Sequence, residues 1–170
     1  KALVGGWMQI SNSNVVELMS HHPYDWIAFD MEHGSFSVKD LPDLFRAVEL
    51  KNKLSLARLP SKNVDICNQV LDAGCGGVII PNIKHEDELI SIRNSCYLPP
   101  LGTRGVGYSR ANVFGKEFRQ YQSQKNNVVI IAMIENVNSV NRLDKILSVK
   151  GLDAILIGPY DLSASMGITG

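Results

Sequence analysis

Short apolar runs recur along the chain, and each is followed by a polar or glycine-rich turn and then by a stretch with helical spacing. The runs cover residues 3–10, 26–32, 54–59, 77–83, 128–134 and 153–157. Runs rich in Val and Ile without polar alternation are typical of strands buried on both faces of a parallel sheet. The intervening segments, such as 41–50 and 64–71, place apolar residues three and four apart. Alternation of strand and helix at about 25 residues predicts βαβ units.

The interval between the fourth and fifth runs is about twice as long as the others. It holds a helix-like stretch at 86–94, then Pro99 and Pro100, and then a loop at 101–112. Consecutive prolines and neighbouring glycines disfavour a regular element, because proline fixes φ and lacks an amide donor. Long loops inside compact domains usually serve function. We therefore expect residues 101–112 to form an irregular, functional loop.

Six strands joined by crossover helices fit two α/β architectures. One is an open doubly wound sheet, and the other is a (β/α)8 TIM barrel of which this chain holds about six βα units. Charged residues follow several runs, at 30–33, 58, 135 and 161. A barrel brings all strand carboxyl ends to one face, whereas an open sheet keeps the ends of its outer strands apart. The sequence therefore favours the barrel, with residues 1–170 as a single, incomplete domain.

A complete barrel typically needs about 250 residues. Six strands would leave a sheet with two open edges, which soluble proteins avoid. We therefore expect the natural protein to continue past Gly170. We also expect residues 159–170 to be weakly anchored or held by a neighbouring chain.

The composition narrows the class of protein. The 17 basic residues balance 17 acidic ones, and 45% of the 170 residues are hydrophobic. Zero net charge argues against nucleic acid or an anionic membrane as a partner, since such binders usually carry a basic excess. Neither an apolar run of about eighteen residues nor a signal-peptide pattern is found, so we expect a cytoplasmic protein. The three cysteines lack C-x-x-C spacing, which argues against a disulfide framework or a zinc site.

Two carboxylates, Glu135 and Asp161, follow neighbouring apolar runs. A carboxylate at the end of a buried strand is costly unless it is paired, hydrogen-bonded or bound to a cation. Two of them at one mouth would repel each other, and Mg2+ or Mn2+ would relieve this with substrate oxygens and water as further ligands. Alternatively, each carboxylate caps a following helix or pairs with an arginine. The spacing leaves both interpretations open.

His33 and Arg58 also end apolar runs. Histidine titrates near neutral pH, so His33 is either a general base or a structural residue bonded to the backbone. Arg58 keeps its charge when buried and must meet an anion. It either stabilises a developing oxyanion at the mouth or forms a structural ion pair with Glu32 or Asp30. A Schiff-base mechanism would instead need a desolvated lysine, and the nearest candidate, Lys84, is expected to be exposed.

Six motifs occur in order along the chain. They are Asp-Met-Glu-His-Gly at 30–34, Ala-Arg-Leu-Pro at 57–60, Leu-Asp-Ala-Gly at 71–74, Pro-Pro-Leu-Gly-Thr-Arg-Gly-Val-Gly at 99–107, Ile-Glu at 134–135 and Gly-Pro-Tyr-Asp-Leu-Ser at 158–163. In this combination the sequence resembles the HpcH/HpaI aldolase family of class II pyruvate aldolases. The resemblance implies a TIM barrel of the phosphoenolpyruvate/pyruvate type in a homo-hexamer. It also implies cleavage of a 4-hydroxy-2-oxo acid to pyruvate and an aldehyde, with Mg2+, Mn2+ or Co2+ as cofactor.

The resemblance also assigns roles to matching residues. His33 would be the catalytic base, and Arg58 would stabilise the enolate oxygen. Glu135 and Asp161 would bind the metal, and the backbone amides of Tyr160 and Asp161 would receive the pyruvate carboxylate.

The resemblance is less direct at two further positions. Asp72 would raise the basicity of the catalytic histidine, but the element order places it on the far face unless a neighbouring subunit supplies it. Met133 stands where the family often has a substrate-contacting glutamine, and a thioether cannot donate a hydrogen bond. Two alternatives remain open: a related carbon–carbon lyase acting on an acyl-CoA ester, or a non-catalytic binding protein on the same barrel. The first would use Arg104 and Arg110 near the mouth, although loop ion pairs explain these two arginines equally well.

Overall fold

The computed structural model describes residues 2–123 and 127–170, and its centre is one parallel β-sheet. The strands are β1 (Gly5–Met8), β2 (Trp26–Asp30), β3 (Leu54–Arg58), β4 (Gly77–Ile80), β5 (Val129–Ile134) and β6 (Ala154–Ile157). They lie in the order β1-β2-β3-β4-β5-β6, and every neighbouring pair is parallel. A doubly wound sheet reverses its strand order at a switch point, so this sequential order confirms the barrel topology.

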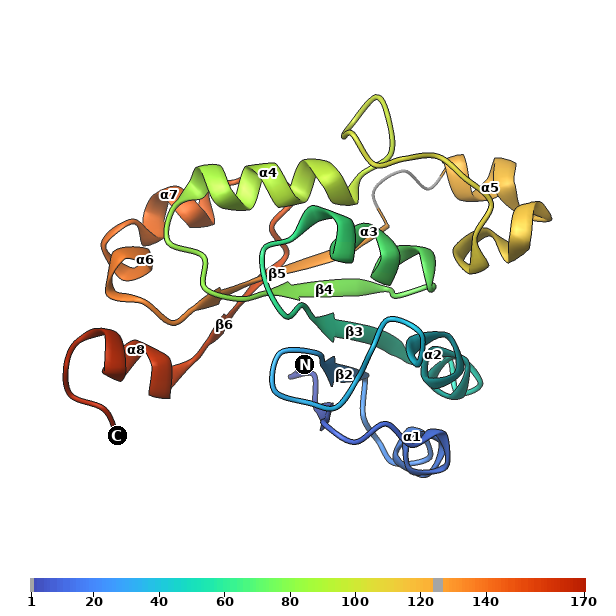
Figure 1. Ribbon diagram of the computed structural model, residues 1–170, viewed down its shortest axis with the longest axis horizontal. Coiled ribbons are helices and arrows are strands. Elements are labelled where there is room, and N and C mark those ends of the chain that lie inside the picture. The colour runs from blue at the N-terminus through green and yellow to red at the C-terminus, as the bar shows by residue number, and fades with distance from the viewer. Residues whose placement is uncertain (1, 124–126) are drawn as a thin grey trace.

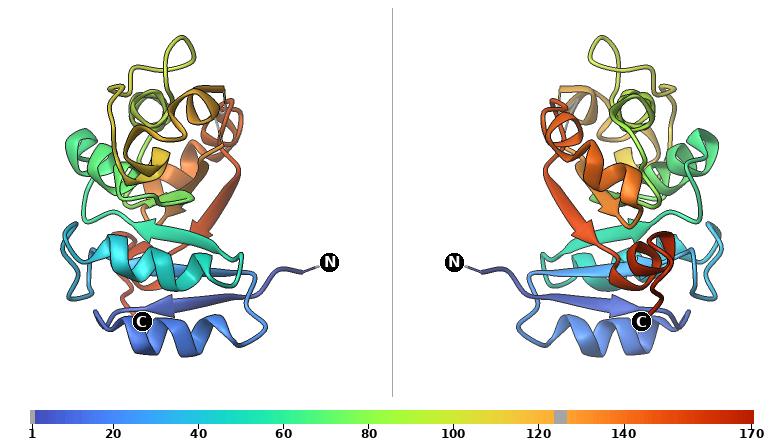
Figure 2. Two further views of the ribbon diagram at one scale, coloured as in Figure 1. Left: turned by 90° about the vertical axis from the view of Figure 1, so that its right-hand side faces the viewer. Right: turned by 90° about the vertical axis from the view of Figure 1, so that its left-hand side faces the viewer.

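Helices follow the strands as the apolar spacing predicts. They are α1 (Ser13–Ser20), α2 (Leu41–Glu49), α3 (Val64–Asp72), α4 (Glu86–Cys96), the 3-10 helix η1 (Arg110–Gly115), α5 (Phe118–Ser123), α6 (Val137–Asn141), α7 (Leu143–Leu147) and α8 (Pro159–Ser165). Figure 1 shows α1 to α4 and α7 along an arc on the outer side of the curved sheet. Figure 2 shows successive strands turned relative to one another around that curve. In the described ranges, no helix is both long enough and apolar enough to cross a membrane.

The strands bury side chains on both faces. A large apolar cluster fills the space between the sheet and the outer helices and includes Ile27, Phe29, Phe45 and Val78. The opposite face carries a second, smaller cluster of Ala28, Leu56, Ile79 and Met133. Successive residues of a strand point to opposite faces, which explains why the apolar runs show no polar alternation. The inner cluster is therefore the lining of the incomplete barrel.

The two edges of the sheet are β1 and β6. Ile157 in β6 is 60% exposed and Trp7 in β1 is 38% exposed, which is unusual for apolar residues of a barrel sheet. α8 follows β6 and buries none of its side chains. Its link to the rest of the chain includes the Ser165 hydroxyl, which accepts a hydrogen bond of 3.0 Å from the amide of Val137.

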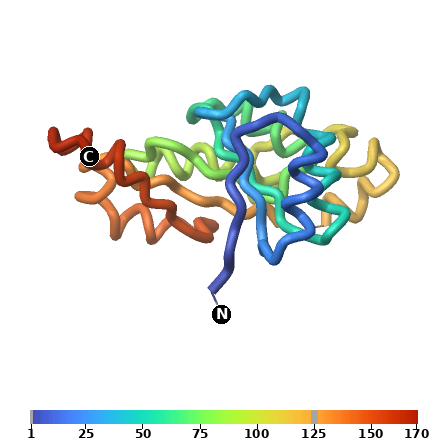
Figure 3. The backbone as a smooth tube through the Cα atoms, turned by 90° about the horizontal axis from the view of Figure 1, so that it is seen from below, coloured from blue at the N-terminus to red at the C-terminus, as the bar shows by residue number. Residues whose placement is uncertain are grey.

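The arrowheads in Figure 1 show that the strands point toward α8, while α5 lies beyond their amino ends. Figure 3 shows the same separation, with α8 at one end of the molecule and α5 at the other. The loop predicted at 101–112 is irregular up to Ser109 and then enters η1. The prediction is wrong only for its last residues, because Asn112 closes a tight turn by accepting the amide hydrogens of Ser109 and Gly115.

Candidate active site

Acidic side chains gather at the carboxyl ends of the strands. A cavity of about 210 Å3 there is lined by Glu32, His33, Asn82, Glu135, Asn136 and Asp161. These residues follow β2, β4, β5 and β6, so four segments that are distant in sequence meet at one mouth. The carboxyl face is where barrel enzymes place their chemistry. His33, Glu135 and Asp161 are thus brought together as the sequence predicts.

A tight turn after β2 presents His33 at this mouth. The carboxylate of Asp30, the last residue of β2, accepts the amide hydrogens of Glu32 (3.1 Å) and His33 (3.0 Å). An aspartate that accepts amides two and three residues further on holds the chain in a turn. The side chain of His33 is left exposed beside the cavity. This position suits a base that meets substrate from solvent.

Glu135 is held by the neighbouring segment. Its side chain is buried, and Oε1 accepts the amide hydrogen of Asn82 at 2.5 Å. Asn82 has a φ of 51°, a left-handed conformation that asparagine adopts more readily than most residues. Burial raises the pKa of Glu135, and the nearby Glu32 and Asp161 carboxylates raise it further. The site therefore favours a positive charge between these carboxylates.

Arg58 lies in a buried ion-pair network at the same end of the sheet. Its Nε and one terminal nitrogen donate to the two oxygens of Asp30, at 2.8 and 2.5 Å. Its other terminal nitrogen lies 3.2 Å from Glu32, and the guanidinium lies 5.3 Å from the Trp7 ring centroid. The structural pairing that the sequence left open as an alternative is thus present. It also fixes the guanidinium close to the cavity.

Asp30 accepts most of the hydrogen bonds in this network. Burial raises its pKa, yet hydrogen bonds from Arg58 and Gln9 hold that pKa well below its usual range. Burial also raises the pKa of Glu32, which the charge of Arg58 offsets only in part. Asp30 thus stays ionised and neutralises Arg58.

The sequence reasoning did not assign Glu32 or Asn82 to the site. Glu32 could have been found, because it stands between the buried Asp30 and the candidate base His33. Asn82 contributes a backbone amide rather than its side chain, and no residue pattern reports that contribution.

The oxygen donors at the mouth fit a hard divalent cation. Oε2 of Glu135 and both carboxylate oxygens of Asp161 accept no hydrogen bond from any described residue. Across residues 2–123 and 127–170, no three His, Cys, Asp or Glu side chains form a ready-made metal cage. Two carboxylates plus substrate oxygens and water would therefore have to complete the coordination, as Mg2+ commonly accepts.

Asp72 lies away from this cavity. It is the last residue of α3, and its Oδ1 accepts a hydrogen bond of 2.6 Å from Arg104. α3 returns from the carboxyl ends of the strands to their amino ends, so Asp72 lies on the far face, where the element order predicts it. A role beside His33 remains a prediction for a neighbouring subunit.

The expectation that Arg104 and Arg110 lie near the mouth is wrong for this chain. Arg104 pairs with Asp72, and Arg110 makes a bidentate pair with Glu49, with one contact at 3.1 Å and the other at 2.5 Å. Their loop follows α4, which runs back to the amino ends of the strands. Segments between a helix and the next strand lie on the face opposite the active site. These arginines are structural ion pairs of that face.

Met133 and Tyr160 differ in their surroundings. Met133 is buried in the inner cluster with Leu56 and Ile79, one layer below the mouth. Tyr160 is 75% exposed in the first turn of α8. Gly158, two residues before Tyr160, lies so close to Glu135 that a methyl group on Gly158 would be 2.8 Å from Oε2. The segment that carries Asp161 is therefore packed directly against the Glu135 carboxylate.

Comparison with known proteins agrees with this geometry. The family model described as HpcH/HpaI aldolase/citrate lyase matches residues 3–170. A hydroxypyruvate/pyruvate aldolase of Roseobacter denitrificans is 32% identical, over 100% of this chain and 67% of that protein. A 4-hydroxy-2-oxovalerate aldolase of Novosphingobium aromaticivorans is also 32% identical, over 98% of this chain and 64% of that protein. The chain thus spans about two thirds of the length of these relatives.

A solved structure shows the same arrangement of elements. The crystal structure of an HpcH/HpaI aldolase/citrate lyase family protein from Burkholderia cenocepacia J2315 superimposes with a TM-score of 0.94 at 30% identity. The match covers 100% of this chain and 69% of that one. The curved sheet of six strands is therefore a shared architecture.

Proposed function

Since this chain belongs to the HpcH/HpaI aldolase/citrate lyase family, we propose that it is the greater part of a metal-dependent aldolase. The reaction is cleavage of a 4-hydroxy-2-oxo acid to pyruvate and an aldehyde. The observation that supports this best is the cavity that unites His33, Glu135 and Asp161 at the carboxyl ends of the strands. Relatives named as pyruvate and 4-hydroxy-2-oxovalerate aldolases support the same reaction class.

Glu135 and Asp161 would hold the divalent cation, Mg2+, Mn2+ or Co2+. When bound, such a cation acts as a Lewis acid toward the 2-oxo group of the substrate. Asn82 keeps Oε1 of Glu135 occupied, so Oε2 is the oxygen that we propose for the cation. The amides of Tyr160 and Asp161 would receive the substrate carboxylate.

His33 would take the proton from the 4-hydroxyl group. The C3–C4 bond then breaks, the aldehyde leaves, and the electron pair stays on the three-carbon fragment as an enolate. Arg58 would stabilise the negative enolate oxygen, which is the role expected of a fixed, buried cation. Return of a proton to C3 gives pyruvate. Asp30 does not react in this scheme. Its two carboxylate oxygens accept hydrogen bonds from Arg58 and hold the guanidinium in place.

The structure bears on the two alternatives. The acyl-CoA lyase interpretation relied on Arg104 and Arg110, which lie in ion pairs at the other face. The binding-protein interpretation relies on Met133, whose side chain lies in the apolar inner cluster. Substrate contact at that depth would be apolar rather than hydrogen-bonded, so we propose that Met133 alters substrate preference and leaves the reaction intact.

The remaining proposals concern the whole protein. We propose a cytoplasmic homo-oligomer, a hexamer by resemblance, in which one barrel domain acts on a small 2-oxo acid. Asp72 is exposed enough to reach a second copy of the chain, with its side chain 53% accessible. Its role in catalysis would then belong to the neighbour's site.

The test is pyruvate release from a panel of 4-hydroxy-2-oxo acids, coupled to lactate dehydrogenase. We expect activity that is lost in excess EDTA and restored by Mg2+, Mn2+ or Co2+. Full turnover in EDTA would overturn the metal mechanism and favour a Schiff-base lysine. Absence of pyruvate with every substrate, together with intact Mn2+ binding, would favour the binding protein instead.

A further inference from the structure

Two buried cysteines lie against each other where α3 packs on α4. The sulfur atoms of Cys67 and Cys96 are 3.2 Å apart, and both residues are almost completely buried. Cys67 lies within α3, and Cys96 is the last residue of α4. A disulfide bond is about 2.04 Å long, so an approach of about 1.2 Å would allow these sulfurs to bond.

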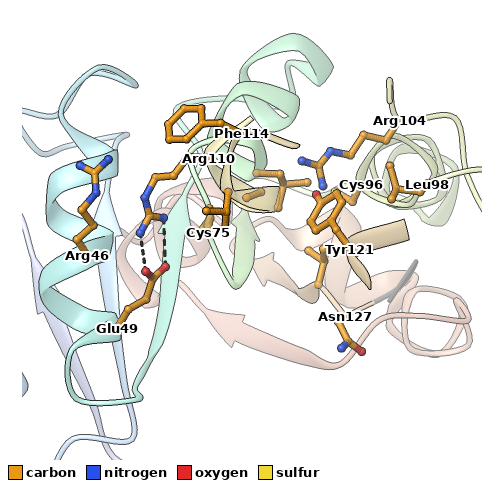
Figure 4. Close-up of a pocket in the computed structure, with 15 residues that line it drawn as sticks. Arg46, Glu49, Cys75, Cys96, Leu98, Arg104, Arg110, Phe114, Tyr121 and Asn127 are labelled. Atoms are coloured by element: carbon orange, nitrogen blue, oxygen red, sulfur yellow. Dashed lines mark hydrogen bonds and ion pairs between the residues drawn. The ribbon is translucent and has the colours of Figure 1, made fainter. Parts of the chain in front are cut away.

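A cavity of about 430 Å3 lies beside the pair, at the amino ends of β4 and β5, and Cys96 is among the residues that line it. Figure 4 shows that Cys96 and Cys75 belong to the wall of this cavity, together with Arg104 and Tyr121. Cys67 does not line the cavity, and its sulfur contacts that of Cys96. Since one water molecule takes up about 30 Å3, a peroxide of two oxygen atoms fits this space easily.

The two sulfurs of the pair differ in acidity, because the contact with Cys67 and burial raise the pKa of Cys96 and keep it a thiol. The contact with Cys96 and the nearby charge of Arg104 lower the pKa of Cys67. Arg104 is itself buried, with 4% exposure, and its guanidinium lies over the Tyr121 ring. A thiolate, not a thiol, attacks an oxidised sulfur, so Cys67 is suited to be the second reactant of a disulfide-forming pair.

Cys75 is a natural comparison within the same cavity wall. Burial raises the pKa of Cys75 to about 12. Its thiol lies 2.9 Å from the carbonyl oxygen of Gly77 and donates to it. Cys75 is therefore held as a protonated thiol by a carbonyl oxygen, whereas the Cys96 thiol lies against the Cys67 sulfur, which can take its proton.

We propose that Cys67 and Cys96 are a modification site that forms a reversible disulfide when the protein meets hydrogen peroxide. In the first step the Cys67 thiolate, 3.2 Å away, takes the proton of the Cys96 thiol, the Cys96 sulfur attacks one peroxide oxygen, and the O–O bond breaks. The thiol proton leaves with the departing hydroxide as water, and Cys96 becomes a sulfenic acid. In the second step the Cys67 sulfur attacks the Cys96 sulfur, the S–S bond forms, and the S–O bond breaks. A second water leaves, so two thiols have reduced one peroxide by two electrons. A dithiol reductant reverses the change.

The test treats the whole chain with hydrogen peroxide, then unfolds it with an alkylating agent present and maps its peptides by mass spectrometry. We expect one linked peptide pair joining Cys67 to Cys96, lighter by two hydrogen atoms and restored by dithiothreitol. Met166 is 55% exposed, and its conversion to the sulfoxide reports the dose that reached the protein. Both thiols fully alkylated at a dose that oxidises Met166 would overturn the proposal.

Three serine variants separate the roles. Cys75→Ser is the matched control and should form the Cys67–Cys96 link unchanged. Cys67→Ser should form no link and should stop at the sulfenic acid on Cys96, which dimedone traps more slowly because the group that takes the Cys96 proton is lost. Cys96→Ser should leave Cys67 free, because the peroxide no longer meets a reacting sulfur. A link through Cys75, or sulfenic acid on Cys67 in Cys96→Ser, would overturn this assignment. The unmodified chain gives the linked peptide by itself, so the proposal does not depend on whether each variant folds.

Discussion

The amide of Asn82 donates to Oε1 of Glu135 at 2.5 Å, and this contact ties the segment after β4 to the carboxylate that follows β5. It depends on the left-handed backbone of Asn82, whose φ is 51°. Glu135 lines the cavity, and its Oε2 accepts no hydrogen bond from any described residue. The backbone shape of one segment thus orients the candidate metal ligand of another.

Replacement of Asn82 tests this relationship. Asn82→Val should be destabilised by about 1–2 kcal/mol, because a β-branched side chain is strained at positive φ. We expect Mn2+ affinity to fall about 10-fold, as it does when groups that orient a metal ligand are lost. Asn82→Gly is the matched control and should keep the affinity, because glycine adopts this φ freely. Titration calorimetry measures both variants, and equal affinity in the valine variant would contradict the assignment.

Gly158 tests the other side of the same carboxylate. A methyl group at this position would lie 2.8 Å from Oε2 and 2.9 Å from Cβ of Glu135, closer than atoms can approach. Gly158→Ala should therefore displace the carboxylate, weaken Mn2+ binding about 10-fold and cost about 1–3 kcal/mol of stability. Gly107→Ala is the control, since nothing lies within 4 Å of its added methyl. Mn2+ binding followed by electron paramagnetic resonance distinguishes them, and identical affinities would mean that Glu135 is not a ligand.

The buried and exposed arginine pairs of this chain offer a direct comparison. Asp30→Asn leaves the charge of Arg58 buried beside only Glu32, so we expect a loss of about 3–5 kcal/mol in the free energy of unfolding. Asp43→Asn breaks the exposed pair with Arg46 and should cost less than about 1 kcal/mol. Urea unfolding followed by circular dichroism measures both. Similar losses in the two variants would show that Asp30 and Arg58 are not the buried pair described here.

Acid should weaken the contact between Glu86 and Arg142, which joins α4 to the turn between α6 and α7. The Arg142 hydrogen bond lowers the pKa of Glu86 from its ordinary 4.5 to about 2. Because the folded pKa is the lower one, this contribution to stability is complete above pH 4.5 and is lost as pH falls toward 2. We expect Tm to fall more steeply over this window in the parent chain than in Glu86→Gln. Parallel curves for the two proteins would contradict the pairing.

The sequence predicts the fold well because the fold depends on repeated local signals. Each apolar run with its following helix marks one βα unit, and the right-handed crossover leaves little choice of strand order. The same logic places His33, Glu135 and Asp161 at one face, because residues that follow parallel strands share a face of the sheet. The prediction for Arg104 and Arg110 is wrong because it does not take account of the direction of α4. A helix that returns to the amino ends of the strands leaves the loop after it on that side.

Other features of the structure lie beyond sequence patterns for physical reasons. The contact of Asn82 with Glu135 is made by a backbone amide, which every residue except proline possesses. The pairing of Cys67 with Cys96 depends on the rotation of α3 against α4, and helix packing angles vary by about 15–20° within one class. Both features arise from the assembled barrel rather than from any single segment.

His33 provides the prediction that bears most directly on catalysis. Glutamine at this position keeps a polar side chain of similar reach but cannot accept a proton, so the step at the 4-hydroxyl loses its base. We expect His33→Gln to lower kcat for pyruvate release by about 10²–10⁴-fold, the range typical of a lost general base. Mn2+ affinity should not change, because the proposed ligands are Glu135 and Asp161. His21→Gln is the matched control, since His21 follows α1 and does not line the cavity. The coupled pyruvate assay with metal saturated measures both variants. Retention of parental kcat in His33→Gln would remove His33 from the mechanism, and a parallel loss of Mn2+ binding would assign it to the metal instead.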